Sequence, residues 1–372
     1  MKVLSIAIMK GLPAGVYHQM QHEHAVASKL QNVTWHNRVF TTHPPFPEAA
    51  HEPFIEVVAP SYGKFTPLLR YELDRAVYTY LRKHHQEYDL ILFRYEKGDP
   101  LQYLFFKNFP NILTVHHTLE LEDIKQLHDI YRPLRIFVEA NLGPRLLQKT
   151  IGLVGVTQEI VDYEKQRVGR YDAPTFVLPN GIAMDSVPLC SDERSGAPKF
   201  VFAASDFHDW HGVDEMIKAF HQHPGDFELH LTGRPQEKHW QLREGDERIK
   251  MPGMLSRQEL YATMAKCDVG LGSFGLHRKN MREACTLKVR EYLAAGLPVW
   301  SGHRDTGLPA DFPYYREKPL EPKQLIDFAM TARAESREKI RAAAAPHIEK
   351  AAILQRFADQ LNQTYQAKAN SR

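Results

Sequence analysis

The chain has 372 residues, enough for two domains of ordinary size, each able to bury its own hydrophobic core. Glycine and proline (21 and 24 residues) and the 25% of charged residues are average, which excludes a disordered, collagenous or repeat-biased protein. Lys and Arg outnumber Asp and Glu by only 47 to 45, so no overall basic field favours nucleic acid as a partner.

The first half of the chain alternates short apolar runs with amphipathic segments. Strands are predicted over residues 3–9, 34–40, 54–59, 90–95, 112–115 and 151–156. Helices are predicted near 16–30, 66–86, 99–108, 119–149 and 158–167. The run 3–9 is interpreted as a buried strand and not as a signal peptide, because it is short and no small-x-small cleavage site follows it.

The same pattern restarts after residue 198. Strands are predicted over 199–204, 227–232, 268–272 and 298–301, and helices near 212–222, 256–267, 286–295 and 321–368. Ser256 and Glu259 have the spacing of a capping box at the start of the second of these helices. This alternation predicts two tandem doubly wound, Rossmann-like α/β domains, each built on a parallel sheet.

Pro, Ser, Gly and charged residues between the two halves are typical of a linker. We predict an N-terminal domain over 1–182, a linker over 183–198, a C-terminal domain over 199–350, and a terminal helix over 351–372, with packing of this helix back on the first domain as one arrangement. Ligands of doubly wound sheets bind beyond the carboxyl ends of the strands. Two such domains facing each other would form a cleft suited to joining two substrates.

The stretch 278–299 carries the residues most indicative of chemistry. Glu283 precedes the predicted helix 286–295 and Glu291 lies within it. Thr286 is a candidate N-cap, the free N–H groups at the helix start favour an anion, and Lys288 adds a point charge for phosphate. A carboxylate at position 291 can accept hydrogen bonds from vicinal ribose hydroxyls. Glu283 lies where a sugar attached to a diphosphate would sit.

The Glu283-x7-Glu291 spacing, followed by Gly296-Leu-Pro298, resembles the signature of the retaining glycosyltransferases of family 4, which have the GT-B architecture. Further matching segments, in the same order and spacing, are Leu-Pro-Asn-Gly-Ile at 178–182, Trp-His-Gly-Val-Asp at 210–214, Ala-Phe at 219–220, Leu-Thr-Gly at 231–233, Pro-Gly at 252–253 and Glu-Leu at 259–260. The Trp-His-Gly segment is similar to that of a subgroup acting on bacterial surface polysaccharides.

This resemblance implies a role for each matching residue. Glu283 would contact hydroxyls of the transferred sugar, and Glu291 would hold the nucleotide ribose. The residues implied for the rest of the donor, mainly its diphosphate, are Cys285, Thr286, Leu287, Lys288, Gly15, His211 and Arg282. His116 or His117, after the strand 112–115, would be the sugar-side histidine; strand alternation sends the two to opposite faces, so at most one should reach a ligand.

The chain departs from the family at two positions. The family usually has an Arg just after the first strand of the second domain and a Lys shortly before the next helix, and both neutralise the leaving diphosphate. Those positions hold Asp206 and His211 here. The positive charge would then come from Lys288 or from neighbours such as Arg290, Arg282 and Lys279.

The resemblance implies transfer of a hexose from a nucleotide-diphosphate sugar to a glycan or lipid-linked acceptor with retention of anomeric configuration. The leaving phosphate oxygen would take the acceptor's proton, so catalysis is mainly positioning and charge stabilisation. No Asp-x-Asp occurs in the chain, so we expect no metal, and no cofactor besides the nucleotide sugar as co-substrate. The three cysteines have no metal or disulfide spacing, which favours a reducing, cytoplasmic location.

Other interpretations stay open. The chain could bind a nucleotide sugar without transferring it, which Asp206 and His211 favour, or could be a nucleotide-sugar epimerase. Glu283 and Glu291 could be solvated charges, Gly15 could serve only its turn, and Cys285 is better explained as a packing residue than as a nucleophile. The basic clusters 82–85 and 132–135 are either solvated helix faces or contacts with anionic headgroups at the cytoplasmic face of the inner membrane.

Overall fold

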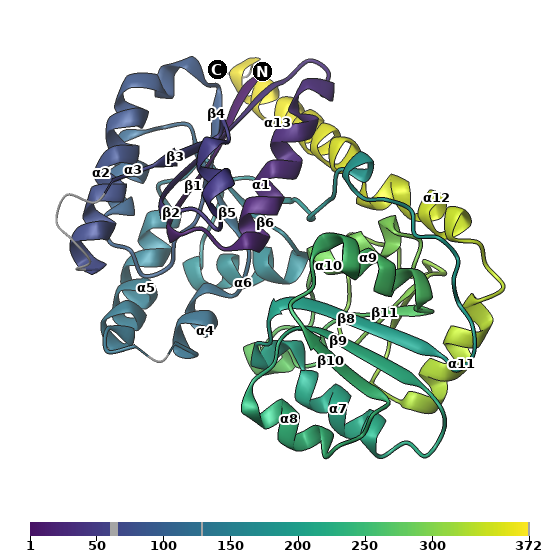
Figure 1. The fold of residues 1–372 in the computed structure, drawn as a ribbon. Coiled ribbons are helices and arrows are strands. Elements are labelled where there is room, and N and C mark those ends of the chain that lie inside the picture. The colour runs from purple at the N-terminus through teal and green to yellow at the C-terminus, as the bar shows by residue number, and fades with distance from the viewer. Residues whose placement is uncertain (60–65, 128, 371–372) are drawn as a thin grey trace. The chain divides into compact units, whose positions relative to one another are not determined.

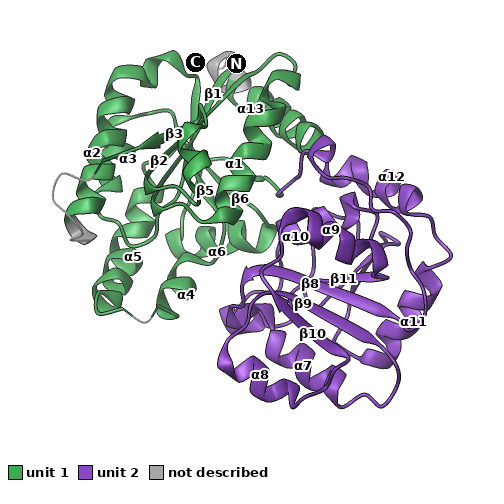
Figure 2. Ribbon diagram, in the orientation of Figure 1, with its two compact units in different colours: residues 1–179, 350–372 green, residues 180–349 purple. Residues whose placement is uncertain are grey.

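The computed structural model describes residues 1–59, 66–127 and 129–370, and the chain divides into two compact units (Figures 1 and 2). Unit 1 consists of residues 1–179 together with 350–372, and unit 2 consists of residues 180–349. In each unit, helices cover a parallel sheet, which confirms the predicted α/β fold class.

Among the described residues, the sheet of unit 1 has seven parallel strands in the order β3-β2-β1-β4-β5-β6-β7. The strands are β1 (Lys2–Gly11), β2 (Thr34–His43), β3 (Ile55–Val57), β4 (Leu90–Arg94), β5 (Ile112–His116), β6 (Gly152–Gly155) and β7 (Thr175–Val177). The central strands β4, β5 and β6 are buried almost throughout, as expected for parallel strands that are covered on both faces.

The helices of unit 1 are α1 (Ala14–Val26), α2 (Thr66–His84), α3 (Gln102–Asn108), α4 (Glu120–Lys125), α5 (Arg132–Leu147), α6 (Gln158–Val168) and α13 (Lys350–Asn370). The predicted helical stretch 119–149 is therefore two helices. α5 has Pro133 in its first turn, where the missing N–H of proline is harmless and a new helix can start. None of the helices, over the ranges described, is long and apolar enough to cross a membrane.

The terminal helix α13 packs on unit 1, beside α1 (Figure 1). The ring of Phe357 meets that of Trp35 edge-on. At the start of α13, the buried ammonium of Lys350 pairs with Glu23 of α1 at 2.9 Å. Residues 350–372 therefore belong to unit 1, although they follow unit 2 in the sequence.

Over its described residues, unit 2 has a six-stranded parallel sheet in the order β10-β9-β8-β11-β12-β13. The strands are β8 (Lys199–Asp206), β9 (Glu228–Arg234), β10 (Ile249–Gly253), β11 (Val269–Leu271), β12 (Val299–Ser301) and β13 (Tyr315–Glu317). The helices are α7 (Val213–His221), α8 (Glu237–Arg243), α9 (Arg257–Lys266), α10 (Leu287–Ala294), α11 (Pro322–Ala332) and α12 (Arg337–Ile348). The capping box of α9 forms: Ser256 Oγ accepts from Glu259 N, and the Glu259 carboxylate accepts from Ser256 N at 2.8 Å.

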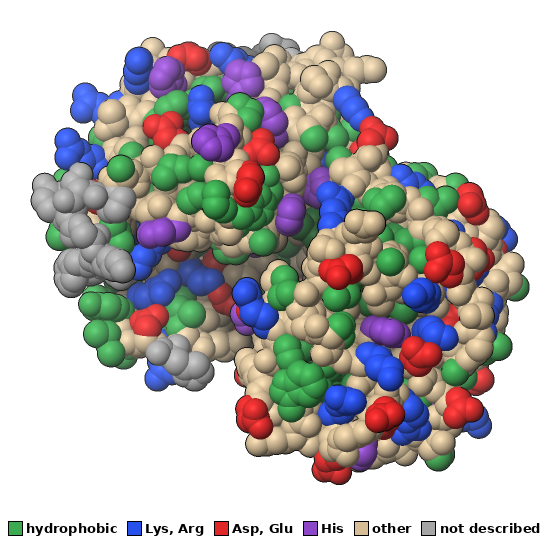
Figure 3. Space-filling view, viewed as in Figure 1, with side chains coloured by type: hydrophobic (Ala, Val, Ile, Leu, Met, Phe, Trp, Pro, Cys, Tyr) green, Lys and Arg blue, Asp and Glu red, His purple; other side chains and the backbone are tan. Residues whose placement is uncertain are grey.

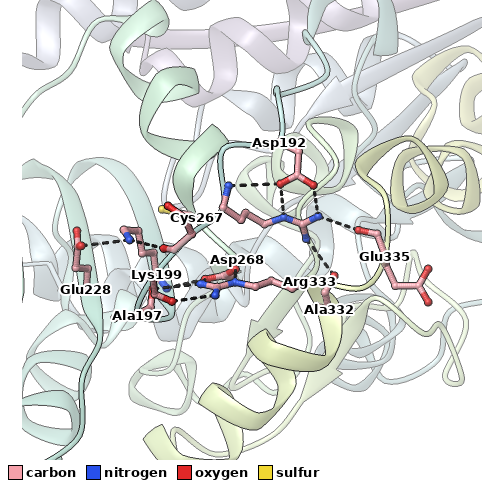
Figure 4. Close-up of polar contacts among 12 residues, drawn as sticks. Asp192, Ala197, Lys199, Glu228, Cys267, Asp268, Ala332, Arg333 and Glu335 are labelled. Carbon is pink, nitrogen blue, oxygen red and sulfur yellow. Dashed lines mark hydrogen bonds and ion pairs between the residues drawn. The ribbon is translucent and has the colours of Figure 1, made fainter.

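Residues 183–198 are part of unit 2 and not the linker that we predicted. Val187 and Cys190 lie in the hydrophobic core of this unit. Figure 4 shows how the end of the segment is held: Arg333 donates to Asp268 at 2.6 Å and to the carbonyl of Ala197 at 3.2 Å. The polar composition indicated a loop correctly, but its few apolar side chains pack against the sheet, so the loop is not a linker.

Candidate functional site

One edge of the unit 2 sheet gathers the predicted donor residues. Ser273 follows β11 and His303 follows β12, and His303 Nδ1 lies 3.1 Å from the carbonyl oxygen of Ser273. The loop before α10 reaches the same edge, because Glu283 forms a β-bridge with Arg304 and the neighbouring Ala284 N donates to Arg304 O at 3.0 Å. Glu283 and the start of α10 therefore lie at the carboxyl edge, where ligands of such sheets bind.

Five buried polar atoms at this edge have no hydrogen-bond partner among the described residues. They are Ser273 Oγ, Thr286 Oγ1, Lys288 Nζ, His303 Nε2 and Thr306 Oγ1. Most buried polar atoms in proteins are hydrogen-bonded, so this group on three neighbouring segments points to a ligand that supplies the partners. The hydroxyls and the ammonium can donate to an anion. His303 Nδ1 lies 2.8 Å from Ser301 Oγ and 3.1 Å from Ser273 O; in the tautomer that donates from Nδ1 to Ser273 O, Nε2 can accept from a ligand hydroxyl, and in the other tautomer Nε2 can donate to one.

Lys288 is the cation of this group. Its Nζ lies 3.8 Å from the ring centroid of Phe202 and 5.8 Å from that of Trp210. Burial lowers the pKa of Lys288 well below its usual value. A buried ammonium without a carboxylate partner is unfavourable, and a bound anion would compensate it.

The start of α10 adds backbone donors next to Lys288. Thr286 is the N-cap residue, yet its side chain makes no capping hydrogen bond, and Leu287 is the first helical residue. The first N–H groups of a helix have no intrahelical partner and favour an anion. Thr286 thus occupies the predicted N-cap position, and Leu287 follows it at the start of the helix.

The two carboxylates differ in their surroundings. Glu291, in the second turn of α10, accepts a hydrogen bond from Tyr261 Oη at 2.8 Å, which orients its carboxylate. Glu283 Oε1 lies 4.0 Å from the guanidinium of Arg304, and its side chain is 15% exposed. Arg282, on the same loop, is exposed. The side chains of Glu283, Glu291 and Arg282 are all at least partly exposed to solvent.

The side chain of Cys285 is buried and hydrogen-bonded within unit 2. Its thiol lies 2.7 Å from an Arg290 nitrogen and accepts from Asn180 N at 3.1 Å. Arg290 itself is fully buried and pairs with Asp305. The Cys285 side chain and Arg290 therefore shape the loop before α10 and do not face a ligand, so Arg290 does not supply the charge that Asp206 and His211 lack.

His211 and Asp206 do not act as free charges. His211 is buried, and Nδ1 of its ring accepts from His208 N at 3.1 Å, so the neutral ring carries its proton on Nε2. Burial, followed by the charge of Lys288, lowers the pKa of His211 far below its usual value. Asp206 accepts from the Arg234 guanidinium at 2.7 Å, which lowers the pKa of its carboxyl. Lys288 is therefore a buried cation that this edge offers to a ligand, beside the exposed Arg282 and Arg304.

In unit 1, Gly15 and His117 lie at the carboxyl edge of the sheet. Gly15 is exposed in the first turn of α1, and a Cβ built there would meet no heavy atom within 4 Å. His117 Nε2 lies 2.8 Å from an Arg94 nitrogen, so it accepts from the guanidinium and the ring proton is on Nδ1. Burial, followed by the charge of Arg94, lowers the pKa of His117 well below its usual value.

His116 cannot meet a ligand from its position. Its side chain is fully buried, stacks on Tyr95 at a centroid distance of 4.6 Å, and lies 3.3 Å from Glu120. The alternation of side chains along β5 turns it into the core. His117 is thus the candidate that remains of the two histidines.

Sequence reasoning missed Ser273, His303 and Thr306. Ser273 and His303 lie two residues beyond the ends of β11 and β12, and a polar residue at such a place is the one local signal that could have found them; Thr306 lies further along the loop after β12. Among the described residues, no group of three or more His, Cys, Asp or Glu could hold a metal ion.

No protein-family model matches the sequence, and no curated protein sequence matches it. Solved structures match over nearly the whole chain. Sucrose-phosphate synthase from Thermosynechococcus elongatus is 18% identical with a TM-score of 0.66, over 99% of this chain and 100% of its own. Anabaena HepE in complex with UDP and glucose is 14% identical with a TM-score of 0.66, over 98% and 100%.

The lipopolysaccharide outer core galactosyltransferase WaaB, in its apo form, is 12% identical with a TM-score of 0.62, over 98% of this chain and 100% of its own. At identities this low, the likeness establishes the fold. The chain has the fold of these proteins, which is the GT-B fold implied by its motifs.

Proposed function

We propose that this chain is a glycosyltransferase that moves a sugar from a nucleotide-diphosphate donor to a glycan or lipid-linked acceptor with retention of anomeric configuration. The observation that carries the proposal is the group of five unpartnered polar atoms around Lys288. An ammonium, hydroxyls and a helix N-terminus suit a diphosphate, and His303 Nε2 suits a hydroxyl. The shared fold with HepE, which was crystallised with UDP-glucose, supports a nucleotide sugar as the ligand.

The donor would lie along the start of α10. Its diphosphate would accept from Lys288 Nζ, Thr286 Oγ1 and the first N–H groups of the helix. Glu291, oriented by Tyr261, would accept from the ribose hydroxyls, and Glu283, near the helix start, from the transferred sugar.

Unit 1 would supply the acceptor side and part of the sugar contacts. Gly15, with open space where its Cβ would be, lets a ligand approach the backbone closely. His117, kept neutral with its proton on Nδ1, can donate a hydrogen bond to a sugar hydroxyl but is no acid at neutral pH.

The reaction then needs little covalent chemistry from the protein. The bond between the anomeric carbon and the diphosphate breaks while the acceptor hydroxyl attacks on the same face, and its proton passes to the leaving phosphate oxygen. Lys288 and the helix N-terminus stabilise the charge that develops on the diphosphate. We propose that no metal takes part, since Lys288 is suited to this role.

A nucleotide-sugar-binding protein without transferase activity is the second candidate. The salt-bridged Asp206 and the neutral His211 favour it, since neither neutralises a leaving group. Thermal shifts with UDP, GDP, ADP and CMP compounds identify the nucleotide, because a ligand stabilises the native state by mass action. Incubation of the matching nucleotide sugar with a glycan acceptor then separates the candidates: glycosylated acceptor supports the enzyme, and binding without transfer supports the second candidate.

A further inference from the structure

Large exposed apolar side chains of unit 1 concentrate where α5 begins. Ile130 is 85% exposed, Leu134 62% and Phe137 65%. Leu134 and Phe137, three residues apart, share one face of α5, and Ile130 lies in the turn just before the helix. Leu104 of the neighbouring helix α3 is 46% exposed. These four side chains are named the α5 patch; Figure 3 shows hydrophobic side chains (green) at this end of unit 1. Single exposed apolar residues are common, but a group of large ones marks a binding surface.

The face that carries the α5 patch becomes basic further along the helix. Arg145 follows Phe137 after eight residues, about 12 Å along the helix axis. The one acidic residue of α5, Glu139, is buried and pairs with Arg167 at 2.6 Å. Lys107 on α3 and Lys149 beyond α5 are also exposed.

These basic residues are available to an anionic partner. Of the described carboxylates, none pairs with Lys107, Arg145 or Lys149. The nearest exposed acid to the patch in sequence, Asp129, lies 3.4 Å from Arg135, so that pair is internally neutral. The exposed face of α5 thus combines apolar side chains with positive charge only.

The patch lies at the same edge of the sheet as His117. β5 ends at His116, α4 follows, and α5 runs back toward the start of β6, so the first turns of α5 belong to the carboxyl edge. A Cβ at Gly98, in the loop after β4, would lie 3.1 Å from Arg135 Cβ, which shows that α5 packs against a loop of this edge. The basic cluster 82–85 ends α2 and leads into β4, at the opposite edge, and the end of α5 with Arg145 and Lys149 lies at that edge too.

We propose that the α5 patch docks this protein on a membrane surface that contains anionic lipids. Leu134 and Phe137 enter the boundary of the acyl chains, and Lys107, Arg145 and Lys149 bind headgroup phosphates, as in helices that lie in the membrane interface. Pairing with a second copy is disfavoured, because a two-fold contact would bring the same basic residues of both copies together. The docking surface does not depend on the proposed transferase activity, although it would present a lipid-linked acceptor at the edge with His117.

Vesicle co-sedimentation of the full chain tests the proposal. Binding is expected to vesicles of equal parts phosphatidylglycerol and phosphatidylcholine, and to weaken with salt and with phosphatidylcholine alone. Leu134→Ser with Phe137→Ser should reduce binding roughly tenfold or more, and Arg145→Glu with Lys149→Glu should abolish the preference for phosphatidylglycerol. The matched controls are Met330→Ser, an apolar residue of α11 that is similarly exposed, and Lys318→Glu with Lys323→Glu, two exposed lysines of unit 2.

The proposal is overturned if the wild type does not sediment with anionic vesicles, or if the patch variants bind as the controls do. It is also overturned if light scattering finds a dimer that Phe137→Ser dissociates, since a second copy would then cover the patch. Nucleotide-induced thermal shifts of the patch variants should equal those of the wild type. This readout keeps failure of membrane docking separate from failure of the proposed transferase function.

Discussion

Replacing Lys288 by Met tests the donor site in two opposite ways. Met keeps most of the side-chain volume against Phe202 and removes the ammonium. Without ligand, the variant should be more stable than the wild type at pH 7, because a buried polar group without a partner costs roughly 1–3 kcal/mol, and a charged one more. With ligand, the variant should bind a nucleoside diphosphate more weakly, because a hydrogen bond to a charged group contributes about 1.5–3 kcal/mol, or roughly 10- to 150-fold in Kd.

The stability difference between Lys288→Met and the wild type should depend on pH in a defined direction. The pKa of Lys288 is lowered in the folded state, whereas an unfolded lysine titrates near 10.4. Between these two pKa values the unfolded state binds more protons, so the stability of the wild type rises with pH toward 10.4. The advantage of Lys288→Met should therefore shrink as the pH rises toward 10.4, where only the cost of the buried neutral amine remains.

Urea unfolding at pH 7 and pH 10, with calorimetry of UDP, GDP and ADP binding, measures both effects. Lys250→Met, which removes an exposed lysine on β10, is the control and should change neither quantity. A Lys288→Met protein that unfolds more easily than the wild type, or that binds nucleotide as tightly, would refute the assignment of Lys288 to the diphosphate.

Three further perturbations address other parts of the account. Glu291→Ala should weaken binding of the nucleotide but not of its 2′-deoxy analogue, which calorimetry with both ligands measures; an equal loss for the two would argue against the ribose contact. Gly15→Ala adds a methyl group that meets no protein atom within 4 Å, so the melting temperature should stay the same or rise slightly. The rate of sugar transfer should fall, because the methyl group would occupy space used by the ligand. An unchanged rate would indicate that Gly15 serves only its turn. Burial raises the pKa of Glu120 to about 8, and an unfolded glutamate titrates near 4.3, so the folded state holds the extra proton and stability should fall as the pH rises between these values. In Glu120→Gln, the free energy of unfolding measured by urea titration should depend less on pH over this range. An unchanged pH dependence would contradict the raised pKa of Glu120.

Local patterns predicted the fold class and most elements of the two sheets. β4 opens with the apolar run Leu90–Phe93, and β5 is apolar apart from Thr114 and His116. The capping box of Ser256 marks the start of α9. β13 has no such signal, because its three residues, Tyr315–Glu317, are mixed in polarity and pair only with the distant β12. The segment 183–198 was predicted as a linker because its polar residues outnumber the few apolar ones that pack into the core of unit 2.

The candidate site could be predicted only where its residues are close in sequence. Glu283, Lys288 and Glu291 belong to one loop and helix, and the helix supplies their spacing. Ser273 and His303 join them through strand pairing, which local sequence does not reveal. Alternation along β5 predicts that one of His116 and His117 is buried, but only the packing of Tyr95 against His116 decides which.

The most direct test of the central claim is to follow cleavage of the nucleotide sugar by proton NMR immediately after the protein is added. The donor is the sugar nucleotide whose base the thermal-shift panel selects, and the spectrum distinguishes the two anomers of the sugar that is released or transferred. We expect the product to keep the anomeric configuration of the donor, and Glu283→Gln to abolish its formation. A product of the opposite configuration would contradict retention, and a protein that binds the nucleotide sugar yet leaves it intact with every acceptor would contradict the enzyme.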